Sequence, residues 1–475
     1  NEDSLVSIVY FGEVRTDPAG ELFQFDPVSE DFALPNPTNG VIDLFSGYYK
    51  TDFAFKMPLF LSNTGGSSDL DSVLFSNVGI SISDIVFPPA LGEITLTIPG
   101  LKSDGVSFTT TLTPEMNHQI VDIADYTLEL TSDEEMNNLI DVEFEVYYPR
   151  QNKILYATRP LVEFSFYLNF RQWNTIYGYL GNETINFQRN SFFTDFDNNF
   201  PDGEFFFQDP SLRFRTRNSY DIPIAMGLSS LYANTDASGI IELEGPGVPV
   251  PPDYFYPAYP DNSNGIKEAL DSLILDKENS NLKDITASEP QRIVYDAFFE
   301  TNYSEEKIQN IIFSESEFNT RVDLHLPFYG RASKLAIRDT LAVNFSEFDM
   351  PVEDIINQAI FKLYYENTYP ADIKLQLYLA NRELVITDTL FEDFSSIPGA
   401  RPTNSYQENP EFVSGEIEAS IPGSEIEHLR EARYIIGEAR LTTVGERDDI
   451  KIFTNQGLFM RLAVIFDIST NIEDF

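Results

Sequence analysis

Apolar and polar residues alternate with a period of two along most of this chain. The alternation is clearest in nine segments rich in β-branched and aromatic residues: 53–61, 78–87, 93–98, 106–112, 141–148, 161–170, 321–328, 373–379 and 458–466. Successive side chains of a strand point to opposite faces, so this pattern predicts strands with one buried face. Many short strands separated by Gly, Pro, Asn and Asp favour β-sandwiches over alternating β-α units. We therefore predict a mainly β fold of tandem β-sandwich-like units with one or a few short helices.

Helical spacing interrupts the alternation in one segment. Its apolar residues recur three and four positions apart: Ile266, Leu270, Leu273 and Ile274. Ser263 is a suitable N-cap, and the acidic Glu268 falls in an early turn. The pattern predicts a helix over 265–278 that packs its apolar stripe on a sheet. Shorter helices are expected at 304–312 and 424–432.

The longest irregular segment, 244–265, precedes and overlaps this predicted helix. Its prolines predict an extended, polyproline-like loop. Long loops in compact chains are usually functional or act as linkers. Four aromatic residues of this loop are candidates for partner contact: Tyr254, Phe255, Tyr256 and Tyr259. The alternative is a linker whose aromatic residues pack on their own domain.

We divide the chain into an N-terminal β-sandwich (1–158), a second β unit carrying the Pro/aromatic loop and the helix (159–330), and a C-terminal β-sandwich (331–475). The second and third units share a sequence feature. Segments 212–232 and 361–379 both run from a strand through Asn-Ser/Thr-Tyr into another strand. Asn suits the backbone of a corner, so we interpret the shared tripeptide as a construction device rather than a binding motif.

Composition narrows the class of partner and the compartment. The chain has 31 Lys and Arg against 76 Asp and Glu, a formal charge of −45. Such a surface repels phosphates, which excludes nucleic acid. The chain has no cysteine, and no window of its sequence approaches the roughly 18–20 apolar residues of a membrane span. The polar start at Asn1 suggests a processed mature chain, with a lipid-bearing cysteine upstream compatible with it.

Catalytic signatures are missing from the sequence. The three histidines, His118, His325 and His428, lie far apart, and carboxylate pairs are expected by chance among 76 acidic residues. We therefore predict no enzyme activity, no catalytic residues and no cofactor. Asp195, Asp197 and Asn199 have the spacing of the first EF-hand ligands and form a weak Ca²⁺ candidate. The sixth position of that loop is Phe200 rather than Gly, and the twelfth is not Glu, so a solvated turn is the preferred interpretation.

Four segments carry a resemblance to known proteins: 279–296, 321–341, 359–379 and 433–466. On these strand-and-turn patterns the chain resembles a group of β-rich envelope proteins of Bacteroidota, taken to include the plug of the type nine secretion translocon. The resemblance covers about the last 200 residues well and 159–232 more loosely.

The resemblance implies a steric function. A folded β protein would dock at the periplasmic face of the outer membrane, on a β-barrel translocon or transporter, and close it while no substrate is engaged. The chain would have no transmembrane segment of its own and would be periplasmic, with a lipid-anchored form as a variant. The alternative is a surface lipoprotein that binds glycan or another ligand within an uptake complex. A third reading, a carboxylate hydrolase, needs a deep cleft with a carboxylate pair.

Overall fold

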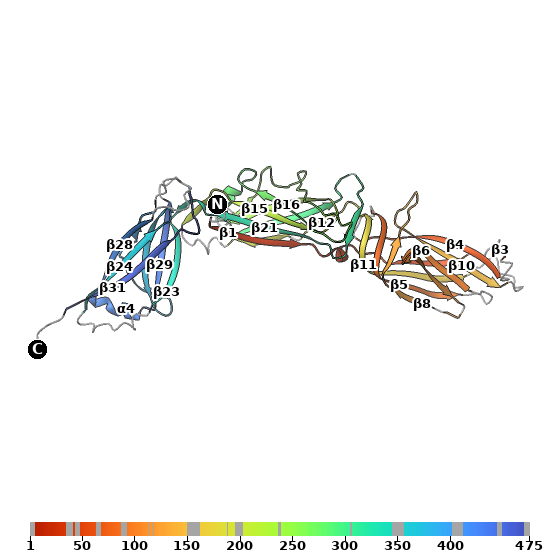
Figure 1. Cartoon of the computed structure of the whole chain (residues 1–475), viewed down its shortest axis with the longest axis horizontal. Coiled ribbons are helices and arrows are strands. Elements are labelled where there is room, and N and C mark those ends of the chain that lie inside the picture. Colours follow the sequence, from red (N-terminus) through yellow and green to blue (C-terminus); the bar gives the residue numbers. More distant parts are fainter. Residues whose placement is uncertain are drawn as a thin grey trace.

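The computed structural model describes residues 5–34, 41–42, 48–62, 68–86, 93–113, 115–116, 118–149, 162–187, 189–194, 203–235, 239–304, 306–343, 356–400, 412–443 and 449–469. Antiparallel strands make up nearly all of its regular structure, which confirms the predicted mainly β fold. The molecule is elongated, with three β units in a row (Figure 1). The first strand lies in the middle of the row rather than at an end.

The distal unit is one 11-stranded sheet. Its strands are β2 (Val28–Leu34), β3 (Val41–Ile42), β4 (Tyr48–Pro58), β5 (Asp69–Val86), β6 (Glu93–Ser103), β7 (Val106–Leu112), β8 (Gln119–Ile123), β9 (Tyr126–Glu129), β10 (Leu139–Pro149), β11 (Val162–Tyr179) and β20 (Asn310–Phe313). The sheet curls, because Phe32 on β2 meets Phe55 on the far strand β4 with ring centroids 4.8 Å apart. Inward-facing phenylalanines fill the enclosed space, including Phe144, Phe164 and Phe166.

The middle unit is a sandwich of two antiparallel sheets. One sheet has the order β1 (Ser7–Arg15), β21 (Phe318–Pro327), β15 (Ser211–Asn218) and β18 (Ala269–Leu275). The other contains β12 (Thr184–Asn186), β13 (Asn190–Phe193), β19 (Arg292–Thr301), β16 (Ile224–Thr235) and β17 (Gly239–Glu242). Aromatic residues join the two inner faces: Phe214 meets Tyr295, and Phe318 meets Phe299. Two short helices, α1 (Ala19–Leu22) and α3 (Leu282–Ala287), lie in the connections.

The C-terminal unit is a second two-sheet sandwich. One sheet contains β23 (Leu335–Ala342), β29 (Tyr434–Thr443), β25 (Ala371–Ala380), β26 (Ile386–Thr389) and β27 (Ser395–Ile397), and the other β28 (Val413–Pro422), β24 (Ile356–Asn367) and β31 (Leu458–Ile468). The helices η4 (Gly423–Glu425) and α4 (Ile426–Glu431) match the helix predicted at 424–432. A three-stranded bridging sheet of β14 (Glu204–Phe207), β22 (Tyr329–Ser333) and β30 (Ile450–Lys451) joins this unit to the middle one.

The shared Asn-Ser/Thr-Tyr corner has the same geometry in both sandwiches. Asn218 and Asn367 are fully buried, and each accepts a hydrogen bond at Oδ1 from the backbone N–H two residues on, of Tyr220 and Tyr369 respectively, at 2.9 Å. In each case the chain leaves one sheet before the corner and enters the facing sheet after it. The buried Asn replaces the ladder bonds that the backbone loses on changing sheets.

The prediction of a helix over 265–278 is wrong. Its central part is the strand β18, which pairs with β15. Leu270 and Ile274 are four residues apart, a spacing that satisfies the period of two as well as that of a helix. Both are exposed, at 71% and 41%, so they do not form a stripe packed on a core. The open edge of β15 offers ladder hydrogen bonds to this segment, and tertiary pairing overrides local propensity.

The helix expected at 304–312 is also absent from the described residues of that segment, which end in β20. The predicted boundaries differ from the strand pairing as well. β1 pairs with β21 and therefore belongs to the middle unit, although it lies within 1–158. β11 pairs with β2 and β5, so the distal unit extends past residue 159 to Tyr179.

Candidate functional site

An exposed group of tyrosines lies on the outer face of the middle unit. We call Tyr254, Tyr256, Tyr259 and Tyr303 the tyrosine patch. Tyr256, Tyr259 and Tyr303 are 51%, 44% and 41% exposed. The rings of Tyr256 and Tyr303 lie 4.8 Å apart, and those of Tyr254 and Tyr256 lie 6.4 Å apart. The patch thus brings together two segments about fifty residues apart in sequence.

The sheet beneath holds the patch in place. Phe255 exchanges backbone hydrogen bonds with Met226 on β16, which extends that sheet by a short bridge. The Tyr254 hydroxyl donates to Glu300 Oε1 on β19 at 3.1 Å, and its ring meets Phe298 edge-on at 6.2 Å. The loop containing the aromatic residues is therefore fixed to β16 and β19.

Local sequence explains why Phe298 can lie there. It sits opposite Gly227 on the neighbouring strand β16. A Cβ at Gly227 would come within 2.5 Å of the Phe298 ring, so only glycine leaves room for a ring lying across the strand. Burial, and then the neighbouring Tyr256 and Tyr259, raise the pKa of Tyr303, whose hydroxyl remains a donor at neutral pH.

The patch contains three of the four residues predicted for partner contact. Tyr256 and Tyr259 are exposed as that prediction requires, whereas Phe255 is half-buried against the core and Tyr254 is half-buried over β19. Sequence reasoning missed Tyr303, which follows an ordinary strand; only the tertiary structure brings it to Tyr256. What the residues contact remains a prediction.

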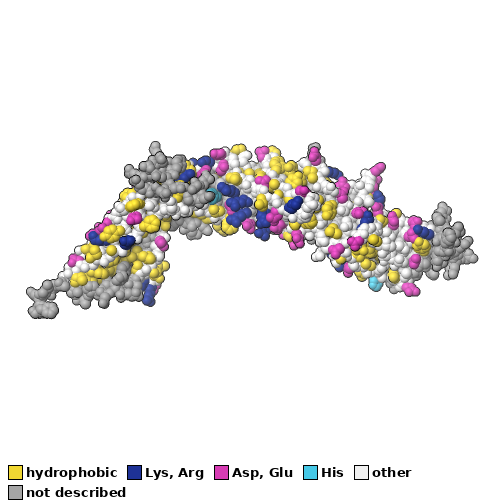
Figure 2. All heavy atoms as spheres, in the orientation of Figure 1, with side chains coloured by type: hydrophobic (Ala, Val, Ile, Leu, Met, Phe, Trp, Pro, Cys, Tyr) yellow, Lys and Arg dark blue, Asp and Glu magenta, His cyan; other side chains and the backbone are white. Residues whose placement is uncertain are grey.

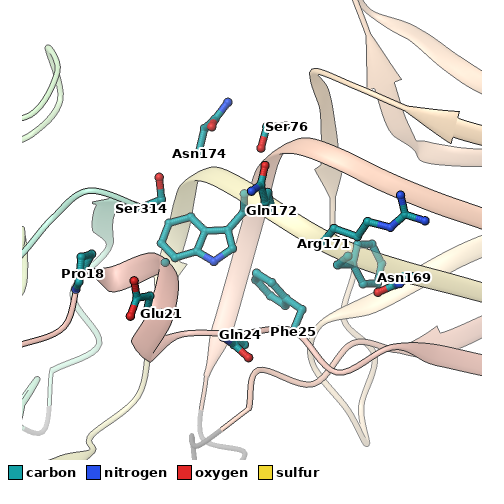
Figure 3. Close-up of a pocket in the computed structure, with 13 residues that line it drawn as sticks. Pro18, Glu21, Gln24, Phe25, Ser76, Asn169, Arg171, Gln172, Asn174 and Ser314 are labelled. Carbon is teal, nitrogen blue, oxygen red and sulfur yellow. The ribbon is translucent and has the colours of Figure 1, made fainter.

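A cleft of about 670 Å³ lies where the distal and middle units meet (Figure 3). It is lined by Pro18, Gly20, Glu21, Gln24, Phe25, Ser76, Asn169, Phe170, Arg171, Gln172, Trp173, Asn174 and Ser314. β11 has several register shifts over these residues, and Arg171 and Gln172 are consecutively exposed instead of alternating. Bulges of this kind re-aim side chains. Here Arg171 and Gln172 both line the cleft, and the Arg171 guanidinium pairs with Asp122 at 3.3 Å.

The single tryptophan lies at this cleft. Trp173 is buried, and its Nε1 donates to the carbonyl oxygen of Phe23 at 2.8 Å. This arrangement anchors the segment before β2 to β11 and makes the indole a packing group. Its position gives the cleft an intrinsic fluorescence reporter.

The weak Ca²⁺ candidate Asp195, Asp197 and Asn199 lies outside the described residues. Within the part of the chain that the structure describes, no three His, Cys, Asp or Glu side chains gather as a metal site would require. Of the histidines, His325 lies on β21, and burial followed by the charges of Arg213 and Arg215 lowers its pKa. Among those same described residues, no helix is long and apolar enough to span a membrane.

Comparison with known proteins gives distant similarities. No protein-family model matches the chain, and no curated protein matches its sequence. The chain is similar to a predicted secreted protein from Parabacteroides distasonis at 14% identity, over 61% of this chain and 87% of that chain, with a TM-score of 0.30. It is also similar to a triple jelly-roll turret protein of an archaeal virus at 10% identity, over 90% of this chain and 91% of that chain, with a TM-score of 0.11. No functional conclusion rests on these similarities.

Proposed function

We propose that this chain is a non-enzymatic docking subunit of the bacterial cell envelope, and that the tyrosine patch is its contact with a partner. The observation behind the proposal is the exposure of Tyr256, Tyr259 and Tyr303 as one aromatic surface on a fixed loop. Tyrosines are enriched at interfaces because they bury a large area at a low cost in conformational entropy. A loop already bonded to β16 and β19 loses little further freedom on binding.

The partner that we propose is an outer-membrane β-barrel translocon of type nine secretion, which the chain would close from its periplasmic side. An elongated body of three packed β units suits a steric role, which needs a rigid shape more than a reactive group. The formal charge of −45 would steer the chain toward basic residues at a pore. A lipid-anchored form of the protein belongs to the same proposal.

A second candidate, glycan binding by a surface lipoprotein of an uptake complex, also has support. Sugars stack on exposed aromatic rings and donate hydroxyl protons to carboxylates. The rings of Tyr256 and Tyr303 pack together, and Tyr254 lies beside Tyr256. Tyr254 donates a hydrogen bond to Glu300, which places a carboxylate next to these rings. The amide-lined cleft at Trp173 is a further surface of suitable chemistry.

Affinity purification from native membranes tests the first proposal. The full chain should retain the translocon, and Tyr256→Ala/Tyr303→Ala should reduce its recovery at least about tenfold, as expected for loss of central aromatic contacts. Tyr364→Ala is the matched control, since Tyr364 is similarly exposed (44%) but lies on β24 of the C-terminal unit.

Recovery of the translocon should be unchanged in the control. Cells lacking the protein should also leak small solutes through the translocon. Unchanged permeability in those cells, or equal recovery by all three proteins, contradicts the proposal. Quenching of Trp173 or tyrosine fluorescence by soluble oligosaccharides, without any translocon recovery, favours the glycan candidate.

A further inference from the structure

The outer face of the β1–β21–β15–β18 sheet carries a concentration of arginine in a strongly acidic chain. Strand register places Arg215 on β15 directly beside Arg321 on β21, and Arg321 beside Glu13 on β1. One step along, Arg217 on β15 lies beside Asn319, which in turn lies beside Arg15. Directly opposed residues point to the same side of a sheet, so the arginines share one face. We call this the arginine face; its arginines are Arg15, Arg213, Arg215, Arg217 and Arg321.

Basic side chains gather over the middle of the molecule in Figure 2, where Figure 1 places β1, β15 and β21. The carboxylates on the strands of this face and next to them are Glu13, Asp323 and Glu268, and both Glu268 oxygens accept from Arg217 Nη2 at 2.8 Å, so an acidic ligand would compete with Glu268 for Arg217. Asp209, just before β15, is paired with Lys277 at 3.0 Å and adds no net charge. Five arginines facing three carboxylates leave an excess of two positive charges, against −45 for the whole chain. The local sign is therefore opposite to that of the protein as a whole.

A buried carboxylate fixes two of the guanidinium groups. Arg321 Nε donates to Asp323 Oδ1 at 2.7 Å, and Arg215 Nε lies in ion-pair contact 3.1 Å from Oδ2. The Asp323 side chain is only 2% exposed although it belongs to the outer face, because the guanidinium groups and Phe11 cover it. Arg321 also stacks on Phe11, with Cζ 4.2 Å from the ring centroid. Both arginines stay accessible to solvent, with 56% of the Arg215 side chain and 42% of the Arg321 side chain exposed.

A similar arrangement in the C-terminal unit shows which arginines of the arginine face have a structural role and which are additional to it. There Glu438 is 2% exposed and is held by Arg440 Nε at 2.7 Å and Arg338 Nη2 at 3.0 Å. An arginine–carboxylate–arginine group is therefore a repeated way of covering a sheet face in this protein. The middle unit adds Arg213 and Arg217 on the same strand as Arg215, and this row has no counterpart around Glu438 among the described residues.

The row has the repeat of an extended polypeptide. Arg213, Arg215 and Arg217 alternate along β15, so their Cα atoms are roughly 7 Å apart. Carboxylates at every second position of an extended segment have the same spacing. Apolar side chains flank the row on the two edge strands of the same face, with Phe11 on β1 and Leu270 on β18 both exposed.

We propose that the arginine face binds an extended acidic segment of a partner protein, with alternate Asp or Glu side chains on Arg213, Arg215 and Arg217 and apolar residues against the flanking strands. Arginine suits this role because its planar fork matches a carboxylate. The excess of only two charges and the apolar flanks favour a polypeptide over a polyphosphate or an anionic membrane, which needs a denser basic cluster. Burial and the charges of Arg213 and Arg215 lower the pKa of His325 on the same face, as expected beside this row.

The arginine face belongs to the β1–β21–β15–β18 sheet, whereas the tyrosine patch packs on β16 and β19 of the facing sheet. The inference is thus independent of the proposed function. The chain could bind an acidic segment whether or not the tyrosine patch contacts a translocon.

Fluorescence anisotropy with two labelled peptides tests the proposal on the full chain. One peptide alternates Glu and Val over about ten residues, and the other replaces each Glu with Gln. The first should bind, weaken at least about tenfold when NaCl is raised from about 0.05 to 0.3 M, and exceed the second about tenfold in affinity. Arg213→Gln/Arg217→Gln should weaken its binding at least about tenfold. This variant leaves the Arg215–Asp323–Arg321 group intact, and its thermal unfolding should match wild type.

Arg382→Gln/Arg461→Gln is the charge-matched control, because it removes two exposed arginines from the C-terminal unit, leaves the Arg338–Glu438–Arg440 group intact and should bind as wild type does. Absence of binding to the Glu peptide, equal binding of the Gln peptide, or equal loss in both double variants overturns the proposal. Binding only to vesicles containing anionic phospholipid would assign the face to a membrane instead. Self-association that disappears in Arg213→Gln/Arg217→Gln would assign it to a second copy of the chain, and also overturns it.

Discussion

Asn367 occupies the corner where the chain passes from β24 in one sheet of the C-terminal sandwich to β25 in the other. Its Oδ1 accepts from the Tyr369 N–H at 2.9 Å, and its Nδ2 donates to the carbonyl oxygens of Pro398 at 3.0 Å and Ala371 at 3.2 Å. The residue is fully buried, so water cannot readily replace these bonds in Asn367→Ala. Leaving a buried polar group unpaired costs about 1–3 kcal/mol.

One orphaned N–H and two carbonyl oxygens that lose a donor give an expected loss of about 2–4 kcal/mol in the free energy of unfolding of this unit. Since a domain of this size loses about 3 °C per kcal/mol, its melting temperature should fall by roughly 6–12 °C. Differential scanning calorimetry of the full chain should show this shift in the transition assigned to the C-terminal unit. The other transitions should stay in place, because multi-unit chains need not unfold in two states.

Asn381→Ala is the matched control. Asn381 makes the same kind of bond, with Oδ1 accepting from the N–H groups of Glu383 and Val385 at 3.0 Å, but it lies in a solvent-accessible turn. Water replaces the lost acceptor there, so the cost should stay below about 1 kcal/mol. If Asn367→Ala loses no more stability than Asn381→Ala, burial does not determine the cost of removing a corner Asn, and the reasoning is refuted.

Two further substitutions examine other parts of the fold. Burial, and then the charges of Arg213 and Arg215, lower the pKa of His325. Neutral His325 therefore contributes to the free energy of unfolding above the unfolded pKa of about 6.5, and this contribution is lost as the pH falls through the folded pKa. The urea midpoint should fall more between pH 7.5 and 5 in wild type than in His325→Gln, and an equal fall would contradict this. A Cβ at Gly330 would overlap a backbone carbonyl oxygen of β14 in the bridging sheet, so Gly330→Ala should cost about 2–3 kcal/mol. Gly437→Ala, whose nearest contact would be an ordinary 3.5 Å, should be close to neutral in the same denaturation assay, and similar losses in both would refute the steric argument.

The sequence predicted most of the strands because alternation reports a buried face directly. The helix at 424–432 was also predictable, since Ile426 and Leu429 are both buried and three positions apart, as on one face of a short helix. Ser424 lies inside η4 and does not cap it; the N-cap is Pro422. The corner could be interpreted from its residue types alone. Asn is among the few residues whose short side chain completes a backbone turn, and both corners use it in that way.

The segment 265–278 could not be assigned from local pattern. Residues four apart lie on one side of a helix and also on one side of a strand, so Leu270 and Ile274 fit both. Pairing with β15, which lies more than fifty residues earlier in the sequence, makes this segment a strand. The candidate binding surfaces depended on tertiary structure in the same way, because Tyr303 meets Tyr256 and Arg321 meets Arg215 only after the sheets have formed.

The sequence by itself determined the mainly β class, the acidic surface, the candidate contact residues Tyr256 and Tyr259, and the corner Asn residues. These properties follow from composition and from neighbours within a few positions. Tertiary structure alone decided that β1 joins the middle unit, that β11 spans from the distal unit to the junction, and that five arginines of three separate strands share one face. Strand pairing between distant segments is set by the total free energy of the packed sheets, and no local window contains that information.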